Sequence, residues 1–245
     1  MLRPRLEPQW NVSATRAVAI QRELAPKVRL VNELRLPLRH VAGIDVGLSD
    51  GAARAAVVVL SLPELEVVDQ VVATTPLSFP YVPGLLSFRE APSVLLALEK
   101  LQVLPDVLVF DAQGYAHPRR MGLATHLGIL LDWPTIGCAK SRLCGSYEEP
   151  APARGSTQPL LDGDEVIGAV VRTRSGVRPL FVSAGHRVSL NMAVEMVLAC
   201  GAGYRLPEPT RRAHQLASLK ESARRHSIGT PASCAHLSQT VRTAA

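Results

Sequence analysis

Three carboxylates in the sequence stand where they could hold a divalent cation. Asp45 comes directly after the apolar residues 41–44, Asp111 comes after the apolar residues 107–110, and Glu90 stands just before a predicted helix. Acidic residues are depleted in strands and are seldom buried without a partner. Hard cations such as Mg²⁺ bind clusters of carboxylate oxygens, and bound Mg²⁺ can orient water and polarise a phosphorus centre. The three carboxylates are therefore a candidate magnesium site.

Each carboxylate also has a structural explanation when it is taken alone. Asp45 could face solvent at a strand end, Asp111 could begin a turn before Gly114, and Glu90 could interact favourably with the dipole of a helix start. The combination favours the metal site, because the predicted topology places Asp45 and Asp111 on neighbouring strands. The spacing alone leaves open whether all three converge.

Basic side chains near these positions could contact a phosphate group. Lys140 follows the apolar strand 135–139. His117 precedes Arg119 and Arg120 at a predicted helix start, where the helix dipole favours anions. The alternatives are an ordinary exposed lysine and a histidine that caps the helix.

Two further histidines have no local motif that assigns them a role. His186 follows a predicted strand, and His214 lies in a predicted helix that begins near residue 208. Without other context, each is better explained as a hydrogen-bonded residue of the core.

A proline-flanked loop presents one aromatic side chain. Its sequence is PYVPG over residues 80–84, with Tyr81 at the tip. Proline fixes the backbone, so the tyrosine would be held stiffly. A stiff aromatic side chain can wedge between base pairs, whereas the alternative is a turn whose tyrosine packs on the surface.

Composition narrows the class of protein. Of 245 residues, 47% are hydrophobic and 20% are charged, which supports a buried core and excludes global disorder. The net charge of +6 suits a nucleic-acid partner, although a genome bias towards arginine would give the same excess. The four cysteines form no CxxC pair, so no zinc site is expected. No segment resembles a secretory signal or a membrane span, so we expect a cytoplasmic protein without a membrane partner.

Hydrophobic periodicity predicts one helix, then a meander, then alternating strands and helices. The first helix is predicted over 13–36, with Pro26 interrupting or bending it. The next three strands are joined by short links, which favours antiparallel pairing. The predicted strands are 41–47, 55–62, 65–74, 107–110, 135–139, 165–172 and 178–183, and the other predicted helices are 91–104, 117–131, 190–200 and 208–224. Residues 150–159 are predicted to form a loop.

This order of elements predicts an α/β fold in which a mixed β-sheet is flanked by helices, as in a ribonuclease H-like domain. We expect a single domain over residues 1–225. Residues 226–245 are rich in Ser, Thr and Ala, so we expect a flexible C-terminal tail there.

Taken together, these segments resemble the endonuclease V family. The resemblance covers the chain from about residue 10 to about residue 220, and several motifs in the same order make it specific. The matching strings are GIDV (43–46), PYVPGLLSFREAP (80–92), PDVLVFD (105–111), GYAHPRRMGLATHLG (114–128), PTIGCAKSRLCG (134–145), PLFVSAGHRVSL (179–190) and YRLPEPTRRAH (204–214).

The resemblance implies a ribonuclease H-like fold, dependence on Mg²⁺ with Mn²⁺ as a substitute, and recognition of hypoxanthine in nucleic acid. The family hydrolyses the second phosphodiester bond 3′ to the deaminated purine and leaves 3′-hydroxyl and 5′-phosphate ends. It does not remove the base. We therefore expect a DNA repair endonuclease whose partner is inosine-containing DNA or RNA, and we expect a monomer.

The resemblance also assigns roles by position. Asp45, Glu90 and Asp111 match the metal-binding carboxylates, and Lys140 matches the active-site lysine. His214 falls where the family carries Asp or His; because histidine is a weaker magnesium ligand than a carboxylate, we expect an auxiliary catalytic role. The residues expected to contact nucleic acid are Tyr81 as the wedge with Pro80, Val82 and Pro83, then Leu86, Gly114, Gly122 and Leu123 as the lesion pocket, and His117.

One motif departs from the family. Members typically carry Asp-Gly-His-Gly where this chain reads Asp111-Ala112-Gln113-Gly114. If Ala112 had to take a positive φ or let the base approach closely, its methyl group would interfere. Two alternatives therefore stay open: an inosine-specific ribonuclease, and a nucleic-acid-binding homologue with a weak active site. A different nuclease on the same fold, such as a junction resolvase, would not need the wedge loop.

Overall fold

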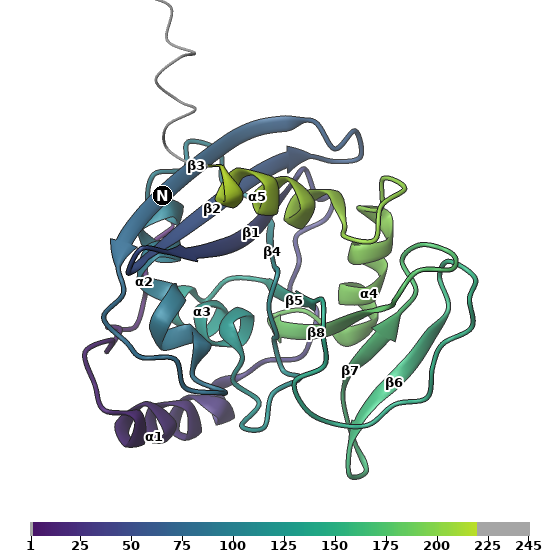
Figure 1. Cartoon of the computed structure of the whole chain (residues 1–245). Coiled ribbons are helices and arrows are strands. Elements are labelled where there is room, and N and C mark those ends of the chain that lie inside the picture. Colours follow the sequence, from purple (N-terminus) through teal and green to yellow (C-terminus); the bar gives the residue numbers. More distant parts are fainter. Residues whose placement is uncertain (1, 220–245) are drawn as a thin grey trace, which may run out of the picture.

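The computed structural model describes residues 2–219, in which one eight-stranded sheet has helices on both faces (Figure 1). The strand order is β3-β2-β1-β4-β5-β8-β7-β6. The strands are β1 (His40–Ser49), β2 (Ala52–Ser61), β3 (Val67–Pro76), β4 (Val107–Phe110), β5 (Thr135–Ala139), β6 (Thr157–Asp162), β7 (Glu165–Val171) and β8 (Leu180–His186). The helices are α1 (Ala14–Leu24), the 3-10 helix η1 (Ala25–Lys27), α2 (Leu86–Leu98), α3 (Leu123–Leu131), α4 (Leu190–Ala199) and α5 (Glu208–Ser218). Among the described residues, none of these helices is long and apolar enough to cross a membrane.

At the centre of the sheet, the end of β4 lies beside the middle of β1. Strands β1, β2 and β3 form the expected antiparallel meander, and β4 then pairs parallel to β1 as far as Ile44↔Phe110. The next residues are Asp45 and Asp111, and the Asp111 amide donates to the Ile44 carbonyl at 2.9 Å. The expected α/β fold, with a mixed sheet and the two carboxylates on neighbouring strands, is confirmed.

The alternating side chains of the central strands divide the core into two layers. Ala42 and Ile44 of β1 belong to the cluster that includes α2 and α3, whereas Val41 belongs to the cluster that includes α4 and α5. This division follows from the period of two in a strand. Because helices cover both faces, the central strands can be almost wholly apolar.

Two predicted helices end earlier in the structure than their periodicity indicates. The first α-helix ends at Leu24 and continues only as the short η1, where Pro26 lies; a prolyl residue cannot donate the backbone hydrogen bond that would extend it. The helix predicted over 91–104 spans 86–98. Beyond it, the Asp69 carboxylate accepts hydrogen bonds from the backbone amides of Gln102 and Val103, which ties that segment to β3.

The helix predicted over 117–131 begins only at Leu123. Residues 111–122 instead form a loop that crosses the sheet, in which the Tyr115 amide donates to the Ala184 carbonyl of β8 at 2.7 Å. Long-range bonds of this kind replace the local bonds of a helix, and the sequence period does not reveal them.

The predicted loop over 150–159 was wrong only in its last three residues, because β6 begins at Thr157. β6 pairs antiparallel with β7, from Thr157↔Val171 to Asp162↔Glu165. It is an edge strand with Pro159 inside, and such strands show a weak pattern. The predicted antiparallel pairing of β7 with β8 is confirmed. The helix predicted over 208–224 was too long, because α5 ends at Ser218 and the backbone of Leu219 is extended. The predicted tail over 226–245 lies outside the described residues.

Helix α5 lies directly on the backbone of β1. A Cβ atom added to Gly43 would come within 2.0 Å of the carbonyl carbon and oxygen of Pro209, at the start of α5. Four residues further along β1, a Cβ atom added to Gly47 would lie 3.2 Å from the Ala217 carbonyl oxygen. The absence of a side chain at Gly43 therefore sets the distance between α5 and the sheet.

We predict that Gly43→Ala lowers the free energy of unfolding by about 1–3 kcal/mol, because α5 must move away from β1 to admit the methyl group. Urea denaturation measures the change. Gly47→Ala is the matched control on the same strand and should cost clearly less. Equal losses in the two variants would contradict the close packing of α5 on Gly43.

His126 lies in the core of the α2–α3 face between two aromatic rings. Its ring centroid is 5.5 Å from that of Trp10 and 5.2 Å from that of Phe88, and its Nδ1 lies 2.8 Å from the Ser87 hydroxyl oxygen. Burial lowers the pKa of His126 to about 4. The native protein therefore keeps this histidine neutral at a pH where the unfolded chain already protonates it.

We predict that His126 makes the native state less stable as pH falls from about 6.5 to about 4, since only the unfolded chain takes up the proton in that window. One such group contributes a slope of at most about 1.4 kcal/mol per pH unit. Urea denaturation at several pH values should give a smaller slope for His126→Gln than for the unchanged protein. Identical slopes would mean that His126 is already protonated in the fold.

Candidate active site

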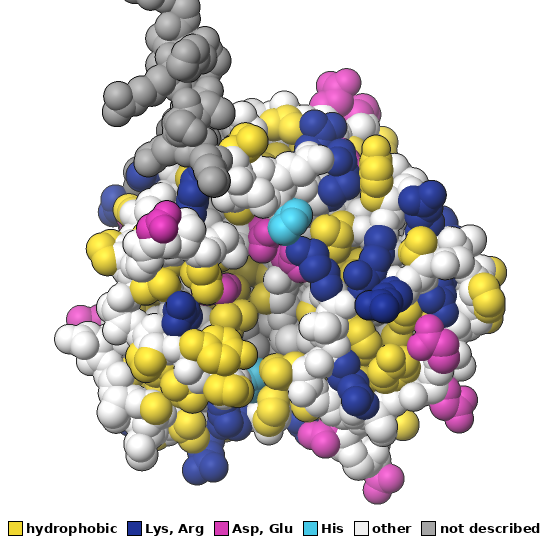
Figure 2. Space-filling view, in the orientation of Figure 1, with side chains coloured by type: hydrophobic (Ala, Val, Ile, Leu, Met, Phe, Trp, Pro, Cys, Tyr) yellow, Lys and Arg dark blue, Asp and Glu magenta, His cyan; other side chains and the backbone are white. Residues whose placement is uncertain are grey.

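A cavity of about 400 Å³ lies at the ends of β1, β4 and β5. Figure 2 shows this face: acidic side chains gather beside a histidine near its hollow centre, with Lys and Arg side chains grouped to one side. Of the residues predicted from the sequence, the cavity is lined by Asp45, Tyr81, Val82, Pro83, Leu86, Glu90, Asp111, His117, Gly122, Leu123 and Lys140. The remaining three, Pro80, Gly114 and His214, do not line it.

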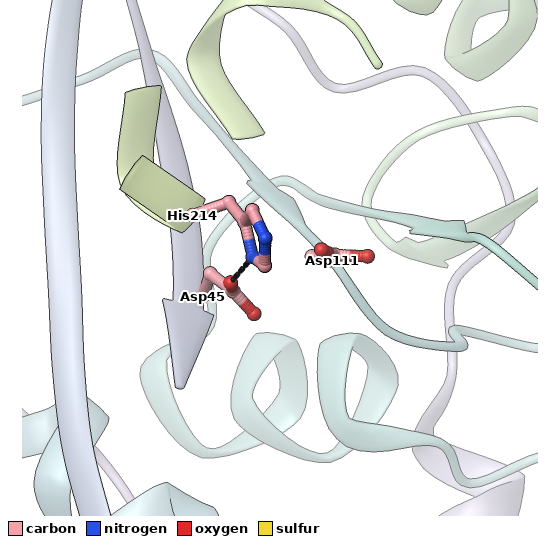
Figure 3. Close-up of side chains that lie close together, drawn as sticks. All are labelled: Asp45, Asp111 and His214. Atoms are coloured by element: carbon pink, nitrogen blue, oxygen red, sulfur yellow. Dashed lines mark hydrogen bonds and ion pairs between the residues drawn. The ribbon is translucent and has the colours of Figure 1, made fainter. Parts of the chain in front are cut away.

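Two aspartates and a histidine form the tightest polar group (Figure 3). Among residues 2–219, Asp45, Asp111 and His214 each offer a ligand atom within 4.8 Å of the others. The Nδ1 atom of His214, on α5, lies 2.6 Å from Oδ2 of Asp45, on β1. The other Asp45 oxygen accepts the backbone amide of Val46 at 2.9 Å. Helix α5 thus brings His214 to Asp45 and Asp111, which only the resemblance to the family, and not residue spacing, had indicated.

Lys140 provides positive charge beside the two aspartates. It comes directly after β5, forms an ion pair with Asp111, and its Nζ lies 3.4 Å from Nδ1 of His214. Arg205 fixes this strand end, because its guanidinium donates to the Lys140 carbonyl at 2.7 Å and to the Pro179 carbonyl at 2.9 Å. Sequence reasoning missed Arg205, since a bond from a side chain to a distant backbone atom leaves no local pattern.

Glu90 lies deeper in the same cavity. It is only 8% exposed, and it stands outside the tight group of Asp45, Asp111 and His214. Burial, and then the nearby charge of Asp45, raise the pKa of Glu90 to about 8, while Asp111 adds to the rise and Arg89 opposes it. The pKa of Asp111 is raised as well, mainly by burial, with Lys140 acting against the rise.

The donor set fits a hard divalent cation. Three carboxylates face one cavity; burial is the main cause that raises the pKa of Glu90 and of Asp111, and repulsion from neighbouring carboxylates adds to the rise. Carboxylate oxygens are the preferred ligands of Mg²⁺, and a histidine nitrogen is a weaker one. A cation held by Asp45, Asp111 and Glu90, with His214 at the edge, would relieve this repulsion.

The proline-flanked loop projects one aromatic side chain beside the cavity. Tyr81 is 73% exposed, while Phe79 and Leu85 at the two ends of the loop are buried in a cluster with Phe88. The Leu85 amide donates to the Val82 carbonyl at 3.0 Å and closes the loop as a turn. The tyrosine therefore stands on a base that is fixed at both ends.

The glycines of the predicted lesion pocket are sites of close backbone packing. A Cβ added to Gly114 would lie 2.4 Å from the Ala184 carbonyl oxygen, so Gly114 packs against β8 rather than lining the cavity. A Cβ added to Gly122 would lie 2.3 Å from the Gln113 carbonyl oxygen. Ala112 does line the cavity, and it is not among the residues with a positive φ. Its methyl group therefore needs no strained backbone, but it does take up space in the wall.

His117 and His186 are both hydrogen-bonded within the protein. The ring of His117 is buried; Nε2 lies 3.0 Å from the Gly84 carbonyl oxygen, and Nδ1 accepts the Arg119 amide at 3.1 Å. Burial lowers the pKa of His117 to about 4. Nδ1 of His186 accepts the Arg29 amide at 3.3 Å, so His186 is a hydrogen-bonded core residue, as its sequence context favoured.

Comparison with known proteins gives the same family at the level of sequence. The family model for Endonuclease V matches residues 22–215. The endonuclease V of Nostoc punctiforme is 53% identical over 213 residues, which make up 86% of this chain and 96% of that protein. The expectation drawn from the ordered motifs is confirmed.

Solved structures give the same family at the level of fold. The crystal structure of endonuclease V from Streptomyces avermitilis superposes with a TM-score of 0.81 at 44% identity, covering 93% of this chain and 100% of that one. The endonuclease V of Ciona intestinalis, solved with a 24mer DNA containing an inosine followed by a ribo-adenosine, superposes with a TM-score of 0.72 at 30% identity, covering 83% and 95%. These relatives have a ribonuclease H-like fold. With most of its length matched by the family model, this chain belongs to the endonuclease V family.

Proposed function

We propose that this protein is a magnesium-dependent DNA repair endonuclease that recognises hypoxanthine and hydrolyses the second phosphodiester bond 3′ to it, leaving 3′-hydroxyl and 5′-phosphate ends. Membership of the family makes the chain a nuclease. One observation carries the proposal: a single cavity joins the group of carboxylates to the loop that projects Tyr81. Chemistry on the backbone and recognition of a base can therefore take place side by side.

Recognition of the lesion is assigned to the side of the cavity near the loop. A volume of about 400 Å³ falls within the range of small-molecule pockets and can take a purine. Tyr81 would enter the duplex as a wedge, and the displaced base would lie between Leu86 and the segment that contains Gly122. Flipping a base out of the duplex costs a few kcal/mol, and this cost is smaller for a deaminated purine because it pairs weakly. The Ciona intestinalis relative was solved with inosine-containing DNA.

Cleavage is assigned to the strand ends. Asp45, Asp111 and Glu90 would hold the magnesium ion, with His214 beside it. Such an ion supplies a water of lowered pKa and neutralises charge that develops on the phosphate. Lys140 would exchange its ion pair with Asp111 for the scissile phosphate, and no side chain forms a covalent bond to the substrate. His214, which bonds Asp45, would fix the direction of that carboxylate.

Inosine-containing RNA is the second candidate substrate. The nucleic acid in the Ciona intestinalis complex carries a ribo-adenosine directly after the inosine, so that relative was solved with a 2′-hydroxyl at that position. Contacts to a 2′-hydroxyl distinguish RNA from DNA. The cytoplasmic location and the monomeric state stay predictions.

We predict one nick in an end-labelled duplex with a single inosine, one nucleotide beyond the 3′ phosphate of the inosine itself, in Mg²⁺ but not with a chelator. Asp111→Asn keeps the size of the side chain and removes a charged ligand, so it should slow the nick by more than about 100-fold. Product length on a denaturing gel gives the position. The same substrate with guanosine in place of inosine is the control.

A nick in inosine-containing RNA but not in inosine-containing DNA would support the endonuclease activity and would show that RNA, not DNA, is the substrate. No cutting of either nucleic acid under any divalent cation would contradict the proposal, and Ala112 would be the first residue to exchange for glycine.

We predict that Tyr81→Ala weakens cutting of inosine in a duplex much more than cutting of inosine in a single strand, because only the duplex needs a wedge. Loss of one aromatic contact to a base corresponds to about 1–3 kcal/mol, or about 5- to 150-fold in KM. Steady-state kinetics on both substrates measure it. An equal rise in KM for duplex and single-stranded inosine would contradict the wedge role of Tyr81.

A further inference from the structure

One backbone carbonyl at the base of the wedge loop binds three side chains. The Gly84 carbonyl oxygen accepts Nε2 of Gln21 at 2.9 Å and Nη2 of Arg119 at 2.8 Å, and Nε2 of His117 lies 3.0 Å from it. Gly84 has a φ of +76°, which ordinary side chains rarely adopt, and it ends the PYVPG loop. A carbonyl oxygen has two lone pairs, so three converging side chains saturate its capacity to accept and connect this peptide to three other segments.

Gln21 uses every polar atom of its side chain in this network. Its amide nitrogen also donates to the Met121 carbonyl at 3.1 Å, and its amide oxygen accepts Nε of Arg119 at 2.5 Å. The side chain is only 1% exposed. Gln21 therefore ties the wedge loop at Gly84 to the segment at Met121, where the opposite wall of the cavity begins.

The helix that carries Gln21 also supports the loop from below. Ala17 and Ile20 of α1 lie in one apolar cluster with Phe79, Leu85 and Phe88. Figure 1 shows α1 at the edge of the molecule, away from the sheet. Helix α1 thus packs against the apolar ends of the wedge loop, and its residue Gln21 also forms hydrogen bonds with both sides of the cavity.

We infer that Gln21 is a positioning residue for lesion binding, which fixes the wedge loop at a set distance from the Met121–Gly122 wall. This inference rests on the proposed wedge function. Gly84 and Met121 both line the cavity, so a change in their separation moves the loop that carries Tyr81 relative to the opposite wall, and this matters only where the wedge is needed. Gln21 does not line the cavity and acts only through these two segments.

The variant Gln21→Met tests the inference, because methionine keeps the length and volume of the side chain and removes its hydrogen bonds. We expect KM for duplex inosine to rise by about 10-fold, as for the loss of one or two buried hydrogen bonds. The turnover number on saturating substrate and the cutting of single-stranded inosine should change by less than about 2-fold. Gln102→Met, the same exchange at an exposed glutamine outside the cavity, is the matched control.

A double-mutant cycle with Tyr81→Ala separates positioning from general destabilisation. If Gln21 acts through the wedge, then Gln21→Met should have little further effect in a protein that already carries Tyr81→Ala. Equal fold-losses in both backgrounds, or a fall in turnover on single strands, would overturn the inference. If Gln21→Met does not fold at the assay temperature, Arg119→Met removes the bonds from a partly exposed side chain to the Gly84 carbonyl and to the amide oxygen of Gln21. It must give the same pattern with a smaller rise in KM, because the bonds from Gln21 to Gly84 and Met121 remain.

The cycle also distinguishes this inference from the proposed function. A Tyr81→Ala variant without effect on duplex cutting would overturn both the wedge and the role of Gln21. A Tyr81→Ala variant that weakens duplex binding, together with an unaffected Gln21→Met variant, would overturn the role of Gln21 alone.

Discussion

Repulsion between carboxylates at one end of the sheet is the constraint on which the rest of the site depends. Parallel pairing of β1 with β4 leaves Asp45 and Asp111 as neighbours, and Glu90 enters the same cavity from α2. The backbone bond from Asp111 to Ile44 fixes the two aspartates, so they cannot move apart without loss of sheet pairing. Lys140 offsets part of this charge, and His214 makes a hydrogen bond with Asp45. Carboxylate oxygens grouped in this way are the ligands that a hard divalent cation prefers.

The elements around the cluster divide into a chemical side and a recognition side. Around the carboxylates, the strands and the close packing of α5 on Gly43 fix the catalytic side chains, and a hydrogen bond from Arg205 fixes the end of β5. On the recognition side, loops carry the contacts, and α1 provides their rigid base through Gln21. Loops held by a scaffold can combine a defined position with exposed side chains, which suits insertion into a duplex.

The sequence predicted the central strands because each is a short apolar run bounded by polar residues, and this was sufficient to place Asp45 and Asp111 together. It did not predict that Gly114 packs against β8, nor that residues 111–122 form a loop instead of a helical turn. Hydrogen bonds between distant segments decide both features. For the same reason, Gln21 and Arg205 could not be found from local patterns, because their partners lie far along the chain.

Diffraction from crystals soaked in Mn²⁺, collected at the manganese absorption edge, tests the metal site most directly, since manganese replaces magnesium at oxygen ligands and scatters anomalously. We predict an anomalous peak in contact with the carboxylates of Asp45 and Asp111, with Lys140 released from its ion pair with Asp111. Anomalous peaks elsewhere on the protein, with none at these carboxylates and Lys140 still paired, would contradict it.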